Sequence, residues 1–261
     1  MKSLIVTADD YAMSPAIDEG ILALVHAGRV GATSCLVLSP RWPEAARSLT
    51  RQVLAQCHVG LHLDLTEFAA HPQALGRLIL KACARQLDPA ALRQAIVAQL
   101  DRFEATLGQA PHYVDGHQHV HQLPQVRQCL VQVLAQRYPA GGPRPWLRIS
   151  DARVAQGWKG RLIAALGSGP LRRLARQQGF ATTDRLLGVY DFDGHAPRYL
   201  TRLAHWLPHT QGVTALMCHP AARLDESDPL GAARWAEYQV LKGPDFAALL
   251  QREQLGLVSS P

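Results

Sequence analysis

The sequence predicts an α/β fold, a distorted TIM-like (β/α) barrel formed by a single domain over residues 1–261. The chain length suits one barrel, which takes roughly 250 residues. Short runs of apolar and β-branched residues alternate with stretches of helical periodicity, which is typical of βα units and a parallel sheet. An open doubly wound sheet would share this alternation. No internal repeat or flexible linker divides the chain.

In the first half of the chain, helix boundary signals accompany the alternation. Ser14 can cap the first helix, with Pro15 at its first position and Gly28 at its exit. Asp88 is the candidate cap of a long amphipathic helix. Strands are expected at residues 4–7, 33–38, 59–65 and 113–114, and further helices at 43–49, 87–107 and 125–137.

The second half continues the alternation with fewer boundary signals. Strands are expected at residues 147–149, 213–218 and 256–259. Helices are expected at 156–178, interrupted around 167–170, and at 232–241 and 244–254. The last two helices and the last strand would close the domain.

Composition limits the class of protein. No run approaches the ~20 apolar residues of a membrane helix, so we expect no stable membrane insertion. The N-terminal residues lack the apolar region and cleavage site of a secretory signal, which favours a cytoplasmic protein. The five cysteines are widely spaced and form no C-x-x-C pair, as expected of free thiols in a reducing compartment.

Much of the net charge of +6 lies in a basic segment at residues 144–176. Such a segment can attract an anionic substrate or a nucleic acid. A solvated helix surface is the favoured interpretation, and because no nucleic-acid-binding motif accompanies the segment, we expect no nucleic acid partner. The stretch 158–178 suits a lid, a subunit contact or a membrane-surface patch, and the sequence does not rank these.

Polar side chains gather where predicted strands end. In a parallel α/β fold these carboxyl ends converge on one face, where active sites are built. The sequence therefore predicts one site built from distant segments, which contribute Asp9 and Asp10, then His62 and Asp64, then Asp115, His117, His119 and His121, and finally His219.

The first two groups suggest metal binding. Asp9 and Asp10 are adjacent on an extended segment, so they should point to opposite sides, one toward a metal and the other toward substrate. A helix-capping pair is the alternative. Period two places His62 and Asp64 on one face, toward the barrel mouth, where an imidazole can ligate a metal and a carboxylate can orient a ligand. A buried, hydrogen-bonded core histidine is the alternative for His62.

The third and fourth groups add further imidazoles. His117, His119 and His121 stand at alternate positions after a strand, which suits a metal or proton-transfer site. A surface histidine loop is the alternative, and all three cannot join Asp10 and His62 on one ion. Cys218 and His219 should point to opposite faces of a strand, so Cys218 is interpreted as core and His219 as functional.

Four motifs together resemble the YdjC-like carbohydrate deacetylases of the ChbG type. They occur in family order and span nearly the whole chain. They are Thr-Ala-Asp-Asp at 7–10, Gly-Leu-His-Leu-x-Leu-Thr at 60–66, Asp-Gly-His-Gln-His-Val-His at 115–121 and Met-Cys-His-Pro at 217–220. The resemblance implies a distorted (β/α) barrel, one divalent metal ion (Mg or Zn) and removal of an acetyl group from an acetylated sugar such as a chitin-derived oligosaccharide. A homodimer is compatible with it.

The resemblance also implies residue roles. Asp10, His62 and His117 match the metal ligands, Asp9 the catalytic base and His219 the general acid. A further set is expected to bind substrate or support the ligands, namely Asp64, Asp115, His119, His121 and Arg148.

The chain departs from the family pattern close to these residues. Tyr11-Ala12 stands where the family has Phe-Gly, Ala221 follows His219-Pro220 where the family has Gly, and Asp64 replaces an uncharged position. These changes leave the ligand set intact and bear on the substrate pocket. A lipid-linked, nucleotide-linked or other acetylated amine would also suit the basic segment.

Two other functions remain open at this point. A phosphoesterase or cyclic-amide hydrolase uses similar ligands, and a two-metal version would need a second set from His119, His121 and Asp64. A non-catalytic sugar-binding protein on the same fold is the other alternative. The presence of Asp9 and His219 argues against it.

Overall fold

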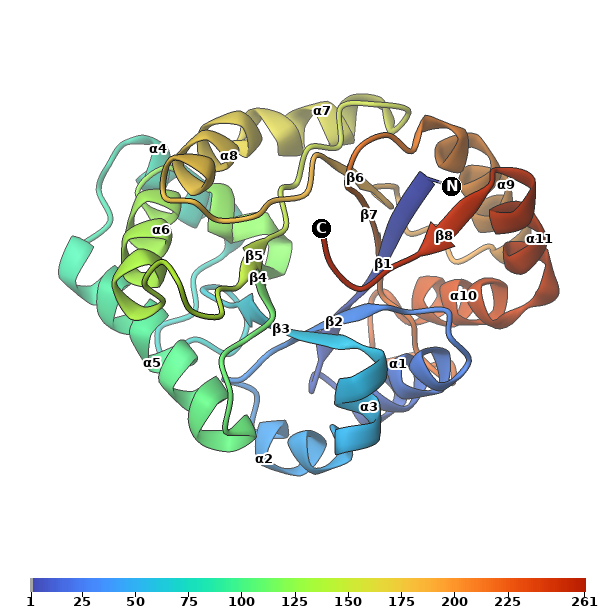
Figure 1. Ribbon diagram of the computed structural model, residues 1–261, viewed down its shortest axis with the longest axis horizontal. Coiled ribbons are helices and arrows are strands. Elements are labelled where there is room, and N and C mark those ends of the chain that lie inside the picture. The colour runs from blue at the N-terminus through green and yellow to red at the C-terminus, as the bar shows by residue number, and fades with distance from the viewer. Residues whose placement is uncertain (1) are drawn as a thin grey trace.

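The computed structural model describes residues 2–261 and contains a curled parallel sheet surrounded by helices (Figure 1). The sheet order is β5-β4-β3-β2-β1-β7-β6, and β8 also pairs with β1. All of these pairings are parallel. The strands are β1 (Lys2–Tyr11), β2 (Ala32–Cys35), β3 (His58–Leu63), β4 (Tyr113–Gly116), β5 (Trp146–Leu147), β6 (Arg185–Leu187), β7 (Thr214–Cys218) and β8 (Leu255–Leu257).

Helices cover the outside of the sheet (Figure 1). They are α1 (Pro15–His26), α2 (Trp42–Ala45), α3 (Arg51–Gln56), α4 (Leu75–Cys83), α5 (Pro89–Leu107), α6 (Val126–Arg137), α7 (Gly157–Ala165), α8 (Ser168–Gln177), α9 (Ala196–Trp206), α10 (Gly231–Lys242) and α11 (Pro244–Arg252). Short 3₁₀ segments are η1 (Ala46–Ser48), η2 (His117–Gln122) and η3 (Leu207–His209). Within residues 2–261, no helix combines the length and apolar character that crossing a membrane requires.

The two edges of the sheet approach each other beside β5. Leu147 forms a parallel bridge with Thr182, and its backbone exchanges hydrogen bonds with Ala181 and Thr183. The sheet is therefore a distorted barrel in which a short bridge, not a long ladder, joins β5 to the segment before β6. This confirms the predicted fold class.

The barrel interior changes from apolar to polar along β1. Leu4 and Val6 point outward into the main core under the helices, whereas Ile5 packs inside with Tyr113 and Trp146. Thr7, two residues further, accepts a hydrogen bond from the Arg148 guanidinium at 2.7 Å. The alternation of a β-strand thus sends apolar side chains to the bottom of the barrel and polar ones toward its carboxyl end.

Several expected boundaries are confirmed by their capping contacts. The Ser14 hydroxyl accepts from the backbone N–H of Ile17, and Pro15 begins α1. The Asp88 carboxylate accepts from the N–H of Ala90 at the start of α5. Gly28, with φ of +65°, lies just beyond α1 in the left-handed region that glycine adopts without strain.

Other elements differ from the prediction. α3, α4, β6 and α9 were not expected, and the strand expected at 33–38 ends at Cys35 in β2. β6 has three residues and begins with a charged one, which is too short and too polar for an apolar-run signal. By contrast, the interruption expected in the 156–178 helix is confirmed, because α7 and α8 are divided at Gly167, whose φ is +150°.

Candidate active site

A cavity of about 520 Å³ opens at the carboxyl ends of the strands. It is lined by most of the residues that the strand-end pattern predicts, together with side chains from α7, η2 and α10. The lining residues are Asp9, Asp10, Met13, His62, Glu67, Gly116, His117, Gln118, His119, Lys159, Ile163, Val189, Tyr190, Phe192, Met217, His219, Asp228, Pro229, Leu230 and Arg234.

A bulge at the end of β1 turns both aspartates into this cavity. The register of β1 against β2 shifts between Ala8 and Tyr11, and Asp10 has a left-handed φ of 69°. Bulges of this kind re-aim side chains at strand ends. The expectation that Asp9 and Asp10 point to opposite sides is therefore wrong, because it assumed a regular extended strand.

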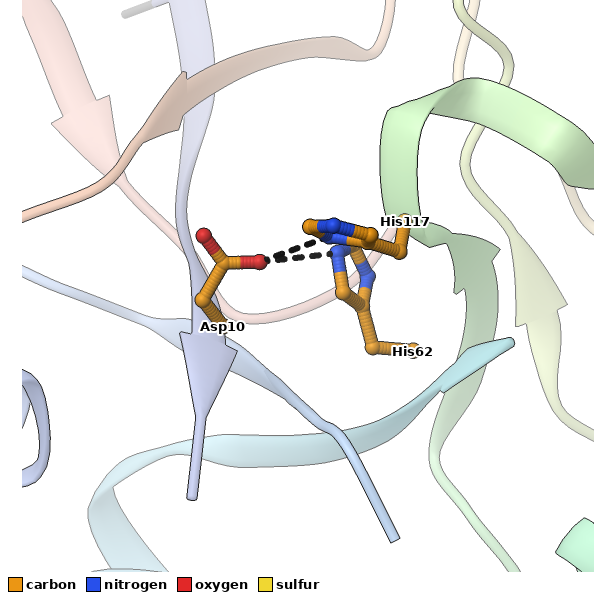
Figure 2. A group of neighbouring side chains, drawn as sticks. All are labelled: Asp10, His62 and His117. Atoms are coloured by element: carbon orange, nitrogen blue, oxygen red, sulfur yellow. Dashed lines mark hydrogen bonds and ion pairs between the residues drawn. The ribbon is translucent and has the colours of Figure 1, made fainter. Parts of the chain in front are cut away.

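Asp10, His62 and His117 come together as a compact group (Figure 2). Asp10 Oδ1 lies 3.0 Å from His117 Nδ1 and 3.4 Å from His62 Nε2. One donor atom from each residue lies within 4.8 Å of the others. One carboxylate and two imidazoles in this arrangement match the three-ligand pattern of catalytic zinc and related ions.

Asp115 holds the ring of His62 in place. His62 Nδ1 lies 2.6 Å from Asp115 Oδ1 and 3.1 Å from the Ser34 hydroxyl. Burial lowers the pKa of His62, but Asp115 and Asp10 outweigh burial and raise it to about 10. The carboxylates thus favour a positive charge at this position, which a divalent ion also supplies. With Nδ1 bonded to Asp115, Nε2 is the nitrogen that faces Asp10.

Arg234 on α10 fixes the other oxygen of Asp10. Its Nη2 donates to Asp10 Oδ2 at 2.8 Å, and its Nε donates to Asp228 at 2.7 Å. Burial raises the pKa of Asp10, but Arg234 and His117 outweigh burial and hold it well below its usual range. Asp10 is therefore an anion whose Oδ1 faces the imidazoles while its Oδ2 is occupied.

Asp9 makes a two-point ion pair with Arg148. The guanidinium donates to both carboxylate oxygens at 2.6 Å, and its side chain is 0% exposed. Arg148 also lies 2.9 Å from Asp115. The pairing fixes the plane of the Asp9 carboxylate, since bidentate arginine contacts are geometrically specific.

Asp9, His62 and Asp115 form a second group of possible metal ligands, and the same arginine contacts this group. Arg148 contacts both carboxylates of that group, so a cation already lies between them. Bringing a second metal ion there would place it beside a buried guanidinium. This arrangement favours one ion at Asp10, His62 and His117 over a two-metal centre.

His219 faces Asp9 across the cavity, with 3.9 Å between His219 Nε2 and Asp9 Oδ2. Its backbone N–H donates to Glu237 on α10, and its ring contacts Phe192 edge-on. Burial lowers the pKa of His219 to about 4, although Asp10 and Asp9 oppose that shift. The imidazole is consequently neutral at neutral pH.

Four predicted residues lie outside the cavity lining, namely Asp64, Asp115, His121 and Arg148. The Asp64 carboxylate accepts backbone N–H bonds from Thr66, Glu67 and Phe68 at 2.6–2.8 Å and so anchors the turn after β3. The expectation that Asp64 faces the mouth beside His62 is wrong, because these donors draw its carboxylate into the turn.

His119 and His121, the remaining histidines of η2, point in different directions. His119 lines the cavity and contacts the Ser150 hydroxyl at 3.0 Å. His121 does not line it, and its Nε2 lies 2.8 Å from the backbone carbonyl of Arg148. The left-handed backbone of Gln118 and His119 breaks the alternation, so the three histidines do not share one face.

Sequence reasoning missed Arg234 and Glu237. They lie three residues apart on α10, and a charged pair with this spacing normally indicates a solvated helix face. In the structure Arg234 is 3% exposed and Glu237 is 1% exposed. No signal in the sequence separates this buried pair from an exterior one.

Fold and site together define a (β/α) barrel protein with a candidate metal-binding group of one carboxylate and two imidazoles at its carboxyl-end face. The family model of YdjC-like proteins matches residues 3–252. The chain therefore belongs to the YdjC-like family, as the four motifs indicated.

Two similar proteins align with most of the chain. A carbohydrate deacetylase of Mus musculus is 34% identical, covering 97% of this chain and 92% of the relative. A chitooligosaccharide deacetylase of Yersinia pestis (strain Pestoides F) is 31% identical, covering 84% of this chain and 82% of the relative.

A crystal structure from Enterococcus faecalis V583, described as that of a candidate cellobiose-phosphate cleavage protein, superposes with a TM-score of 0.73. It is 20% identical and covers 99% of this chain and 97% of that one. At this identity the similarity shows the fold alone.

Proposed function

We propose that this chain is a metal-dependent deacetylase that hydrolyses the N-acetyl group of an acetylated amino sugar or oligosaccharide. The observation that carries the proposal is the meeting of Asp10, His62 and His117 in one cavity, with Asp9 and His219 facing each other beside them. The names of the mouse and Yersinia relatives support the reaction and the substrate class.

Asp10, His62 and His117 would hold one divalent ion, Mg or Zn. The donor set fits such an ion, because the carboxylates already favour positive charge at His62 and because Asp10 Oδ1 faces both imidazoles. When bound, the ion supplies Lewis acidity toward the amide carbonyl and the attacking water.

Asp9 is the proposed base. Arg148 orients its carboxylate, and Asp9 Oδ2 remains within 3.9 Å of His219 Nε2. A carboxylate at this position can accept a proton from water on the cavity side. The two-point contact with Arg148 keeps the carboxylate plane constant while it does so.

His219 is the proposed proton donor to the leaving amine. An amine leaves poorly until it is protonated, so the reaction needs an acid. Because His219 is neutral at neutral pH, it must first receive a proton within the cycle, and Asp9 is the carboxylate facing its Nε2. We therefore assign the pair as a proton relay. Asp9 accepts a proton from the attacking water and transfers it to His219, and His219 then donates a proton to the leaving nitrogen.

The test is acetate release from N-acetylated mono- and oligosaccharides, with and without a chelator. We expect release that stops with chelator and returns with added Mg²⁺ or Zn²⁺. Asp9→Asn should reduce turnover by at least a hundredfold and retain metal binding, with Glu226→Gln on an exposed loop as the control. Chelator-resistant release, or full activity of Asp9→Asn, would overturn the proposed mechanism. Release from no sugar by metal-loaded protein would overturn the proposed function.

A further inference from the structure

An exposed aromatic side chain stands at the rim of the catalytic cavity. Among residues 2–261, the large hydrophobic side chains that are exposed are Leu80, Trp158, Leu162 and Leu224, and Trp158 is the aromatic member, 69% exposed. Trp158 lies in the first turn of α7, and Leu162, one turn later, is 54% exposed. These two residues form a short apolar stripe on the outer side of α7.

The stripe borders the cavity. Lys159 and Ile163, each one residue further along α7, both line it. Successive helix positions are ~100° apart, so the lining pair and the exposed pair are neighbouring stripes of the same helix. The Lys159 ammonium lies 5.9 Å from the centre of the Trp158 ring, which places the indole directly beside a lining side chain.

α7 is held firmly against the barrel at this point. Ile163 packs on the cluster that contains Leu186 and Met217, and its carbonyl accepts from the Gln122 side chain at 2.6 Å. Lys159 forms an ion pair with Asp191 from the connection after β6. The exposed indole is therefore presented by an anchored helix.

We propose that Trp158 forms a second sugar subsite, which stacks on a pyranose ring of an N-acetylated oligosaccharide beyond the ring whose acetyl group is cleaved. This inference rests on the proposed function. One face of a pyranose carries mainly C–H groups and is apolar, so it matches the flat face of an indole. The neighbouring Lys159 and Asp191 offer a donor and an acceptor for the ring hydroxyls.

The stripe suits a sugar better than a second protein or a membrane. Two exposed side chains fall far short of the roughly 800 Å² per partner that a stable protein interface buries. Asp191 pairs with Lys159, the cation next to the indole, and so removes one positive charge that would attract an anionic lipid surface. Continuity with the cavity then favours the substrate itself as the occupant.

The test compares N-acetylglucosamine with tri-N-acetylchitotriose as substrates of wild type, Trp158→Ala and Trp158→Phe. For Trp158→Ala we expect KM for the trisaccharide to rise about tenfold, with kcat and both constants for the monosaccharide unchanged. Trp158→Phe should retain part of the effect because it keeps a ring. Leu80→Ala, an exposed side chain on α4 outside the cavity lining, is the matched control and should change nothing.

A binding measurement separates this inference from the proposed function. In Asp9→Asn protein, the trisaccharide should alter tryptophan fluorescence, and the added substitution Trp158→Phe should abolish most of that change. Equal effects of Trp158→Ala on both sugars, or on neither, would overturn the subsite. The subsite would also be overturned if wild type bound vesicles containing phosphatidylserine and Trp158→Ala lost that binding while its sugar kinetics stayed unchanged. If wild type releases acetate from neither sugar, the proposed function fails, and the fluorescence titration still decides whether Trp158 contacts the trisaccharide.

Discussion

Glu237 should lower the stability of the protein as pH rises, and Glu237→Gln should remove that effect. The carboxyl group is buried on α10, where it accepts from the Tyr190 hydroxyl at 2.6 Å and from the backbone N–H of His219. Burial raises the pKa of Glu237 from 4.5 to about 7, because these donors and Arg234 offset only part of the cost of burying a charge. Asp9 adds to the rise.

The sign and size follow from linkage between protonation and folding. Between pH 4.5 and 7 the folded protein holds this proton more tightly than the unfolded chain, so the free energy of unfolding falls with rising pH. The shift corresponds to about 3 kcal/mol once the group is ionised in both states. Glutamine stays neutral and can still accept from the His219 N–H, so Glu237→Gln avoids this loss.

Urea unfolding at pH 5, 6, 7 and 8 measures the effect directly. Glu237→Gln should exceed wild type by about 1 kcal/mol at pH 5, and its advantage should grow progressively to about 3 kcal/mol at pH 8. Glu226→Gln, on an exposed loop, should follow wild type at every pH. A variant that is less stable than wild type at pH 8, or a gain that does not change with pH, would refute the reasoning.

Two further substitutions test the geometry around the candidate metal centre. Arg234→Met should weaken Zn²⁺ binding by ~10- to 100-fold in a competitive chelator titration, because Asp10 loses the contact that orients it. Arg202→Met, which removes a partly exposed ion pair elsewhere, is the control and should leave the affinity unchanged. Unchanged affinity of Arg234→Met would contradict the role of Arg234. Asp64→Ala should cost roughly 1–3 kcal/mol in urea unfolding, because partly buried N–H donors of the turn lose their acceptor, and should leave Zn²⁺ affinity unchanged. A drop in affinity would show that Asp64 acts on the metal centre.

The strand-end rule predicted most of the site because it depends on topology alone. His62 lies near the carboxyl end of β3 and His117 directly follows β4, the adjacent parallel strand, so any sheet with this order brings them together. The motif residues Asp9, Asp10 and His219 reach the same cavity for the same reason. Their roles in binding a metal and moving protons remain predictions.

What the sequence did not predict depends on departures from regular geometry. The bulge that turns both Asp9 and Asp10 inward carries no glycine or proline that would mark it. The alternation of the strand predicts that Asp64 faces the barrel mouth, yet its carboxylate turns away to accept hydrogen bonds from N–H groups of the following turn. Arg234 and Glu237 are buried because carboxylate and hydroxyl partners from distant strands and loops meet them, and such pairing has no local signature.

The long sequence separation of the Asp9 and Asp10 contacts has a consequence for folding. Asp9 meets Arg148 across 139 positions, and Asp10 meets Arg234 across 224. During synthesis, the two carboxylates emerge early and stay hydrated until their arginines follow. Contacts of such long range form late and slowly. We therefore expect the cavity at the carboxyl ends of the strands to be the last part of the barrel to become ordered, so that a chain able to bind a divalent ion tightly at the proposed site has also finished folding.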